Sequence, residues 1–293
     1  MPKPRELRRR IKSVQSTRKI TKTMELVATS KLKRAQDRVV AARPYAASLA
    51  EVMADLYSPD LAERFPLLRQ PVAGMAGRRV ALLLITANRG LCGAFNANLI
   101  REARARIEQL EPDAAVDLHL VGKKGVSYFK FTKRPVASQR IDIGDKPTAA
   151  HAAELVGPLM QQFETGVLDA VEVVFAQFKS AVSTPATTLR ILPITPPRAD
   201  GRSGARTVSY ILKPSAEAIL ARLLPLYVQN QVYRALVETV AGFYGAQRTA
   251  MKNATDNAGD IIELLQRTYN RARQAQITQE IAEIVGGAEA LRG

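Results

Sequence analysis

The chain has 293 residues, of which 46% are hydrophobic, and this is enough apolar material for at least one folded core. Its 43 lysines and arginines outnumber 27 aspartates and glutamates, so the formal net charge of +16 favours an acidic partner: nucleic acid, an anionic membrane or an acidic protein surface. One cysteine excludes an internal disulfide framework, and no apolar run has the length of a membrane span or a secretory signal. We expect a soluble or peripheral protein of a reducing compartment.

Residues 1–58 are predicted to form a first helix. A proline is tolerated in the first turn of a helix, so Pro4 fits its start, and about 40 residues follow before Pro44 can break it. Apolar residues recur at spacings of four and three in three groups whose register shifts from group to group: Leu7, Ile11 and Val14, then Ile20, Met24 and Val27, then Leu32, Ala35 and Val39. We therefore expect this helix to bury different faces along its length.

The same helix carries much of the positive charge. Residues 1–40 hold 13 lysines and arginines against 3 aspartates and glutamates. Three interpretations are open: a solvated charged face, a targeting peptide, or a basic side that faces an acidic partner. The helical pattern runs past the usual length of a targeting peptide. Nucleic acid is a weak candidate for the partner, because no aromatic residue precedes Tyr45 and no binding module is recognisable.

Prolines and glycines indicate a connector at 59–77, and residues 78–213 are predicted to form an inserted domain. Apolar strands alternate there with helices: strands at 80–85, 116–121, 170–178 and 187–194, helices at 95–110 and 148–163, and a short helix after 122–125. Thr148 is the expected N-cap of the second long helix. A candidate edge strand at 208–212 follows a loop rich in Pro, Gly and Arg. This alternation predicts a Rossmann-like α/β domain with a largely parallel sheet.

Patterns that would indicate chemistry are missing from this domain. The turn after the first strand lacks the G-x-G-x-x-G spacing, and GKKG at 122–125 lacks the upstream glycine and the following Ser or Thr of a P-loop. His119 and His151 have no Cys, Asp or Glu at metal-ligand spacing. Cys92 has no evident base beside it and is expected to be a packed thiol in a turn. We therefore expect no catalytic residue, no cofactor and no metal.

The last predicted element is the longest. No proline follows Pro225, so the stretch to Gly286 can form one helix of about 60 residues, roughly 90 Å long. Its seam has the four-three spacing of a coiled coil but is thin and rich in small residues: Ile261, Leu265, Thr268, Ala272 and Ala275. Such a helix needs a partner. We predict that residues 214–293 pair with 1–58 as a long antiparallel two-helix coiled coil, with the α/β domain inserted between them.

Three blocks of this sequence resemble the γ subunit of F-type ATP synthases. They are IKSVQSTRKITKTMELVATSKLKRAQ at 11–36, NRGLCGAFN at 88–96, and the terminal ATDNAGDIIELLQRTYNRARQAQITQEIAEIVGGAEA. The resemblance therefore covers both ends and the middle of the chain. One departure lies before Pro214, where this chain has Lys213 and the family often has an acidic residue. The paired cysteines of the chloroplast type are absent as well.

The resemblance implies a function that the residues alone do not. It implies the central rotor shaft of the enzyme, with the helix pair inside a hexamer of α and β subunits and one copy per complex. The α/β domain would sit at the foot with the ε subunit on the ring of membrane c subunits, and catalysis would belong to β. The resemblance also implies a peripheral position on the cytoplasmic face of a bacterial inner membrane, or on the matrix face of a mitochondrial one.

The resemblance assigns roles to individual residues. Met24, Arg248, Gln274 and Thr278 match positions expected to make coupling contacts with β, with ordinary packing in the helix pair as the alternative. The basic face expected to oppose an acidic loop of β is formed by Lys19, Lys22, Lys31 and Lys33. The contact with the c ring and ε is expected near Tyr210 and Lys213.

A second function stays open. A basic coiled-coil protein with an α/β module could bind nucleic acid. Salt-sensitive retention on DNA would favour that alternative, whereas co-purification with ATPase subunits would favour the rotor.

Overall fold

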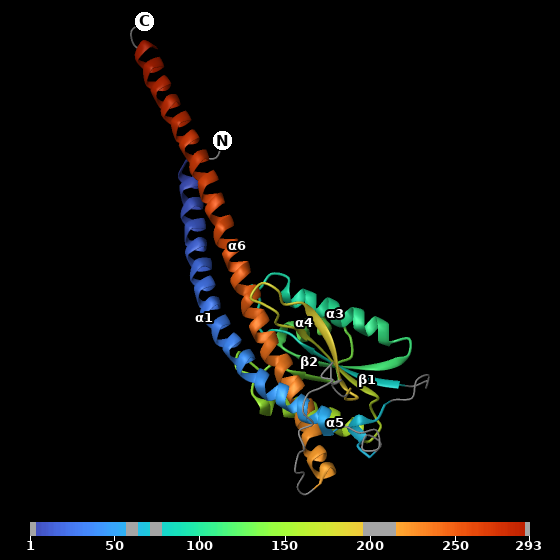
Figure 1. The fold of residues 1–293 in the computed structure, drawn as a ribbon. Helices are drawn as coiled ribbons and strands as arrows, with labels where there is room; N and C mark the ends of the chain where they lie inside the picture. Colours follow the sequence, from blue (N-terminus) through green and yellow to red (C-terminus); the bar gives the residue numbers. More distant parts are fainter. Residues whose placement is uncertain (1–3, 57–63, 71–77, 196–214, 291–293) are drawn as a thin grey trace. The chain divides into compact units, whose positions relative to one another are not determined.

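The computed structural model describes residues 4–56, 64–70, 78–195 and 215–290 (Figure 1). The chain divides into two compact units: Met1–Thr29 with Gln247–Gly293, here called the outer helix pair, and Ser30–Ala246, here called the α/β unit. Two long helices contribute to both units, α1 at Pro4–Leu56 with 53 residues and α6 at Ala216–Ala290 with 75 residues. The predicted long terminal helices are therefore confirmed.

Both helices continue through a proline that was expected to limit them. Pro44 lies inside α1, and Pro225 lies inside α6 rather than before its start. A proline within a helix costs about 3 kcal/mol, because one backbone hydrogen bond is lost. Core packing on both sides offsets this cost, since the flanking turns carry fully buried side chains: Leu49 and Met53 after Pro44, and Leu224 and Val228 around Pro225.

The α/β unit contains a five-stranded sheet in the order β3-β2-β1-β4-β5. The strands are β1 Arg78–Ile85, β2 Ala114–Val121, β3 Ser138–Arg140, β4 Ala170–Ala176 and β5 Ala186–Leu192. Every pairing is parallel except β4 with β5, so the predicted largely parallel sheet is confirmed. The three-residue strand β3 is too short to leave an apolar pattern and was not predicted. The strand expected at 208–212 lies outside the described residues.

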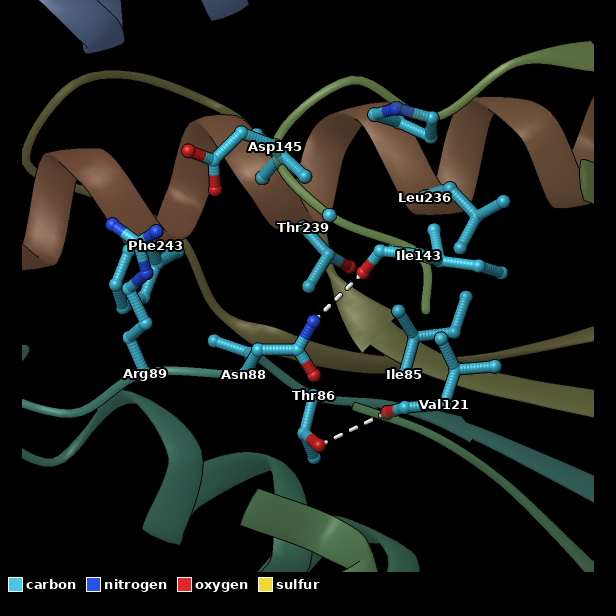
Figure 2. Close-up of a pocket in the computed structure, with 14 residues that line it drawn as sticks. Ile85, Thr86, Asn88, Arg89, Val121, Ile143, Asp145, Leu236, Thr239 and Phe243 are labelled. Carbon is cyan, nitrogen blue, oxygen red and sulfur yellow. Dashed lines mark hydrogen bonds between the residues drawn. The ribbon is translucent and has the colours of Figure 1, made fainter. Parts of the chain in front are cut away.

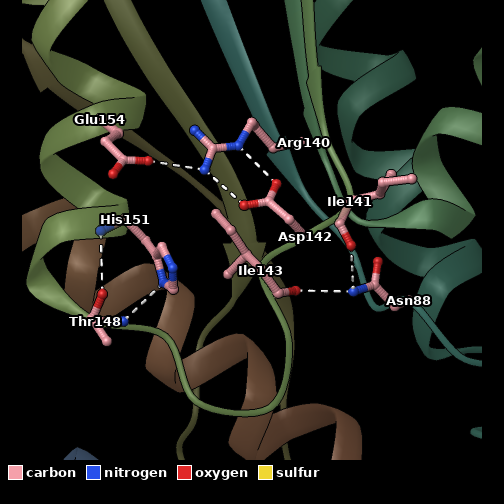
Figure 3. A network of polar contacts seen from close by, with 8 residues as sticks. All are labelled: Asn88, Arg140, Ile141, Asp142, Ile143, Thr148, His151 and Glu154. Carbon is pink, nitrogen blue, oxygen red and sulfur yellow. Dashed lines mark hydrogen bonds and ion pairs between the residues drawn. The ribbon is translucent and has the colours of Figure 1, made fainter.

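The helices of this unit are α3 at Phe95–Leu110, α4 at Lys123–Phe131 and α5 at Ala149–Glu164, and a short 3-10 helix, η1, spans Pro66–Leu68. The predicted N-cap of α5 is confirmed. The Thr148 hydroxyl accepts a hydrogen bond from the His151 backbone N–H at 3.3 Å, and His151 Nδ1 accepts one from the Thr148 N–H at 3.2 Å (Figure 3). His151 thus has a structural role as part of the helix cap.

Each face of the sheet has its own apolar core. One cluster joins β1 and β4 to α5 and to α6, and it includes Leu83, Val173, Phe163 and Val228. The other joins the opposite face to α3 and α4, and it includes Leu82, Leu99 and Phe129. Strands buried on both faces read as continuous apolar runs, which is why β1 and β4 were visible in the sequence.

One of these apolar strands, β4, contains a buried carboxylate. Glu172 in β4 is 1% exposed, and its oxygens accept hydrogen bonds from Arg106 Nε at 2.6 Å and Arg106 Nη2 at 2.7 Å. Arg190 of β5 adds a bond at 3.2 Å. Burial alone would raise the pKa of the Glu172 carboxyl, but the two guanidinium groups outweigh burial and lower it. The structure therefore keeps this carboxylate charged.

The substitution Glu172→Gln tests the ion pair. Removing the charge leaves Arg106 without its partner, so we expect the free energy of unfolding to fall by about 3 kcal/mol in urea denaturation. The native pKa lies below the unfolded value of about 4.3, so the pair's stabilisation is complete above that pH and is lost as the pH falls through the native pKa. In the variant, the free energy of unfolding should therefore lack the fall with decreasing pH that titration of Glu172 causes. The control is Glu111→Gln, in an exposed pair with Arg134, and a loss equal to that of Glu172→Gln would contradict the account.

Candidate functional site

The outer helix pair is closed by a narrow seam on α6. Buried and half-buried positions recur there at spacings of four and three: Met251, Thr255, Ala258, Ile262, Leu265, Tyr269 and Ala272. The predicted seam was right at Leu265 and Ala272, and Thr268 is half-buried beside it. It was wrong at Ile261, which is 47% exposed, and at Ala275, which is exposed. Ile261 and Ile262 are equivalent in an apolar pattern, so only packing against the partner helix selects the second.

The facing seam on α1 keeps one register. Within the outer helix pair, its buried and half-buried positions include Leu7, Ile11, Val14, Thr21 and Ala28. The third predicted group, Leu32, Ala35 and Val39, continues the same spacing in the α/β unit. The expected shift of register is therefore wrong. Small and polar side chains hold the middle of the seam, and Ile20 and Val27 point outward, 60% and 51% exposed.

The two helices of this pair run antiparallel. Thr21 and Thr255 share a hydrogen bond with their hydroxyl oxygens 2.8 Å apart, and one turn away Arg18 lies beside Gly259. In this register the first described residue of α1, Pro4, is opposite Ala272. Burial on α6 ends at Ala272, and every side chain from 273 to 288 is exposed. The last turns of α6 therefore have no partner within the described residues (Figure 1).

The predicted coupling residues fall into two groups within the outer helix pair. Met24 and Arg248 are half-buried on the paired part. Gln274 and Thr278 are exposed on the unpaired end, about 40 Å further along α6 than Arg248 at 1.5 Å per residue. The Thr278 hydroxyl donates to the Gln274 carbonyl at 3.0 Å, so the two share a face as predicted. That end also exposes apolar side chains that motif matching missed, although their spacing was visible: Ile277, Ile281, Ile284 and Val285.

The four lysines of the predicted basic face have different environments. In the outer helix pair, Lys19 and Lys22 are exposed, and Lys22 Nζ lies 3.1 Å from Glu25. In the α/β unit, Lys33 is exposed and paired with Asp37 at 2.9 Å. Tyr210 and Lys213, the predicted foot contact, lie outside the described residues.

Lys31 differs because it is bound inside the α/β unit. Its Nζ donates to Asp145 Oδ2 at 2.9 Å and to the Tyr244 hydroxyl at 3.1 Å. These two bonds raise the pKa of Lys31, and the ion pair joins α1 to the loop after β3. Long sequence separation hid this contact from pattern reasoning.

The carboxyl edge of the sheet is where open α/β folds bind ligands, at the point where the strand order reverses. Here β1 lies between β2 and β4, and α6 lays Leu236, Thr239 and Phe243 across the end of β1 (Figure 2). The cavity that remains has a volume of about 40 Å³. This holds a few water molecules and is too small for a nucleotide.

The glycine turns at this edge are closed by internal hydrogen bonds. At the start of α4, the N–H groups of Lys123, Lys124 and Gly125 donate to Asn88 Oδ1, the Ala87 carbonyl and Thr86 Oγ1. Amides used in this way are not available to a phosphate. The GKKG segment therefore braces the sheet edge, in line with its mismatch to a P-loop.

The NRGLCGAFN block is braced in the same manner. Asn88 donates to the carbonyls of Ile141 and Ile143, and Asn96 donates to the Arg89 carbonyl and lies 3.2 Å from Cys92 Sγ. Cys92 is buried, as expected of a packed thiol, and burial raises its pKa. This block therefore holds its own loop closed.

Metal ligands do not cluster in the described parts of the chain: no three His, Cys, Asp or Glu side chains gather there. His119 Nδ1 lies 2.7 Å from the Ser138 hydroxyl across β2 and β3, which is a structural contact. Among the described helices, none is both long enough and apolar enough to cross a membrane.

The chain is similar to known proteins over its whole length. A family model described as ATP synthase matches residues 3–291. The ATP synthase gamma chain of Gemmatimonas aurantiaca is 62% identical over 294 residues and is covered in full, as is this chain. The gamma chain of Leptospira biflexa is 42% identical over 292 residues, which cover 99% of this chain and 100% of the relative.

Solved structures show the same fold at lower identity. A chain of the rotor of Euglena gracilis mitochondrial ATP synthase aligns with a TM-score of 0.63 and 19% identity, over 94% of this chain and 98% of that one. A chain from the central stalk and c ring of the Tetrahymena thermophila enzyme aligns with a TM-score of 0.60 and 23% identity, over 80% and 99% of the two chains.

The substitution Gly122→Ala tests the closed edge of the sheet. Gly122 has φ +95, and an added Cβ would lie 2.0 Å from the Thr86 carbonyl oxygen. We expect a loss of about 2 to 4 kcal/mol in the free energy of unfolding, from backbone strain and overpacking together. Gly157→Ala is the matched control, because Gly157 lies inside α5 with open space around it. It should gain about 0.5 to 1 kcal/mol, and equal effects of the two changes would contradict the account.

The pair Ile262→Ala and Ile261→Ala tests the register of the seam. Ile262 is 8% exposed and Ile261 is 47% exposed. Truncating the buried isoleucine should lower the local opening free energy of the helix pair by about 2 to 3 kcal/mol, whereas truncating its neighbour should cost about 0.5 kcal/mol. Amide hydrogen exchange over 251–272 of the full chain measures both. A larger effect at Ile261 would restore the seam predicted from sequence.

Proposed function

We propose that contacts along α6 and α1 couple c-ring rotation to the nucleotide sites of the β subunits. The premise is that the chain belongs to the ATP synthase gamma-chain family and is the central rotor stalk subunit of the enzyme. The chain is a non-catalytic subunit of that complex. Relatives that match it from end to end are gamma chains, which removes the ground for the nucleic-acid alternative. Coupling then consists of differential contacts between a turning surface and successive states of β.

The observation that carries this proposal is the unpaired end of α6. Residues 273–288 form a single helix with every side chain exposed, including four large apolar ones. A lone helix with an apolar stripe is stable in water only when another surface covers the stripe. A hexamer of α and β subunits that encloses this end would supply that surface and would sense its rotation.

Gln274 and Thr278 lie on this end and can form the upper coupling contacts. Both side chains are neutral hydrogen-bonders, and Thr278 already has a partner in its own helix. Such groups can exchange partners as the shaft turns without leaving a buried charge unpaired. The free-energy barrier to turning these two side chains from one β subunit to the next therefore stays small.

Met24 and Arg248 form the lower coupling contacts. Met24 is half-buried and offers a flexible apolar side chain. Arg248 is half-buried, and its guanidinium forms no ion pair with the described residues. A forked cation in that position suits a carboxylate of β.

The exposed lysines suit a looser contact. Lys19, Lys22 and Lys33 are exposed, and the ion pairs of Lys22 and Lys33 are with carboxylates of their own helix. Attraction over roughly one Debye length, about 8 Å in physiological salt, lets an acidic loop of β approach without a rigid lock. Lys31 is excluded from this role, because Asp145 and Tyr244 already bind it.

The remaining partners follow the family. We infer one copy per complex, with the ε subunit and the c ring contacting the chain near Tyr210 and Lys213. The c ring is also named for the similar chain of Tetrahymena thermophila. The position would be peripheral, on the cytoplasmic face of a bacterial inner membrane or on the matrix face of a mitochondrial one.

Substituting Arg248→Ala tests the coupling contact. The complex should assemble, because the buried seam from Met251 to Ala272 stays intact, but ATP synthesis driven by an acid–base jump in proteoliposomes should fall at least about fivefold. Arg248→Lys keeps the positive charge without the two-pronged guanidinium group, and its rate of ATP synthesis should lie between those of the wild-type and Arg248→Ala complexes. Arg101→Ala, an exposed arginine of α3, is the control. Normal synthesis in an assembled Arg248→Ala complex would remove Arg248 from the coupling contacts.

A further inference from the structure

A short cationic surface lies at the end of α4. Residues 123–134 contain five lysines and arginines and no carboxylate: Lys123, Lys124, Lys130, Lys133 and Arg134. Among them Phe131 is 85% exposed, as much as any large apolar side chain in the described residues. We call Lys130, Phe131 and Lys133 the α4 tip.

The helix is amphipathic, and the α4 tip is on its outer side. Gly125 and Phe129 are buried against the sheet, and Phe129 is only 2% exposed. Phe131 follows two residues later and therefore points away from that core, beside Lys130. Removing the Phe131 side chain from water would be favourable, yet no described residue buries it.

Nearby carboxylates do not neutralise the α4 tip. Glu111 is paired with Arg134 at 2.6 Å, and Glu108 is paired with Arg104 at 3.5 Å. Lys130 and Lys133 form no ion pair with the described residues. The tip therefore keeps its positive charge.

The backbone at Lys133 gives a second, independent observation. Lys133 has φ +55, the left-handed conformation that glycine adopts most easily. The turn is a Schellman motif, with Lys133 N–H donating to the Lys130 carbonyl and Arg134 N–H to the Phe129 carbonyl. Glycine is the usual residue at this position. A lysine held there against its backbone preference indicates a use for its side chain.

We propose that the α4 tip binds the headgroup surface of an anionic phospholipid membrane, with Phe131 in the interface and Lys130 and Lys133 on the phosphates. Clustered cations around an exposed aromatic ring are typical of interfacial binding. An acidic protein loop would satisfy the lysines but leave Phe131 in water. Single-stranded nucleic acid would need a series of stacking rings in a groove, and this tip has one ring. The inference rests on the proposed function only because a c ring brings a membrane within reach.

The test uses the absence of tryptophan from the chain, which contains none. Phe131→Trp places the sole tryptophan at the α4 tip of the full chain, and excitation at the red edge of the absorption band separates its emission from that of the tyrosines. Vesicles of phosphatidylcholine with phosphatidylglycerol should shift its emission to shorter wavelength, and brominated lipid should quench it; vesicles of phosphatidylcholine alone should do neither. Val182→Trp is the matched control, because Val182 is equally exposed, in the β4–β5 hairpin. Its emission should not change with either vesicle.

Further variants in the Phe131→Trp chain separate charge from folding. Lys130→Gln and Lys133→Gln should each weaken partitioning about fivefold, the effect of one cation near an anionic surface. Lys133→Gly should weaken it by the same factor, yet the midpoint of thermal unfolding should stay the same or rise, because glycine relaxes the turn. A loss of binding with no loss of stability is a result that misfolding cannot produce.

Several results would overturn the inference. They are an unshifted Phe131→Trp emission on anionic vesicles, an equal shift for Val182→Trp, or partitioning that ignores the lysine variants. A shift produced by single-stranded DNA or polyglutamate, but not by vesicles, would also overturn it. Because these measurements use the full chain alone, their failure would leave the coupling proposal standing, and a failure of Arg248→Ala would leave the membrane contact standing.

Discussion

The structure depends on a narrow seam between two very long helices. In the outer helix pair, large apolar side chains such as Leu7 and Ile262 share the seam with small or polar ones such as Thr21, Ala28, Thr255 and Ala258. Apolar burial stabilises by about 25 cal/mol per Å², so each such layer adds little, and stability has to come from the number of layers. The same economy leaves Ile20, Val27 and Ile261 on the outside. A narrow seam therefore gives both a slender shaft and an exposed apolar surface that a partner subunit can contact.

In the α/β unit, α6 packs against the carboxyl edge of the sheet, where open α/β folds usually bind a ligand. In related architectures the carboxyl edge of the sheet receives a nucleotide, whereas here α6 occupies it and the N-terminal amides of α4 are bonded to the loop after β1. Lys31, Asp145 and Tyr244 add a polar strut between α1, the loop after β3 and α6. The α4 amides that a phosphate would need instead hold the loop after β1.

Much of the fold could be predicted from sequence, but the side-chain register could not. Continuous apolar runs marked β1 and β4, and Thr148 marked the start of α5, because those signals are local. Pro44 and Pro225 misled, since the packing that overrides a proline lies on other elements. The seam of α6 was predicted correctly at Leu265 and Ala272 but placed on Ile261 instead of Ile262, because these two isoleucines are equivalent until a partner helix is present. At the candidate site, motif matching predicted Gln274 and Thr278 on one face of α6, but it could not show that Lys31 is bound to Asp145.

The central claim is that this chain turns as a shaft inside a fixed ring of partner subunits. Because Cys92 is buried, an exposed cysteine introduced by Ser127→Cys on α4 can carry the sole optical probe, with the hexamer fixed to a surface. During ATP hydrolysis the account predicts that single-molecule polarisation records stepwise rotation of the probe in one direction. A probe that keeps a fixed orientation while the same complexes hydrolyse ATP at full rate would contradict it.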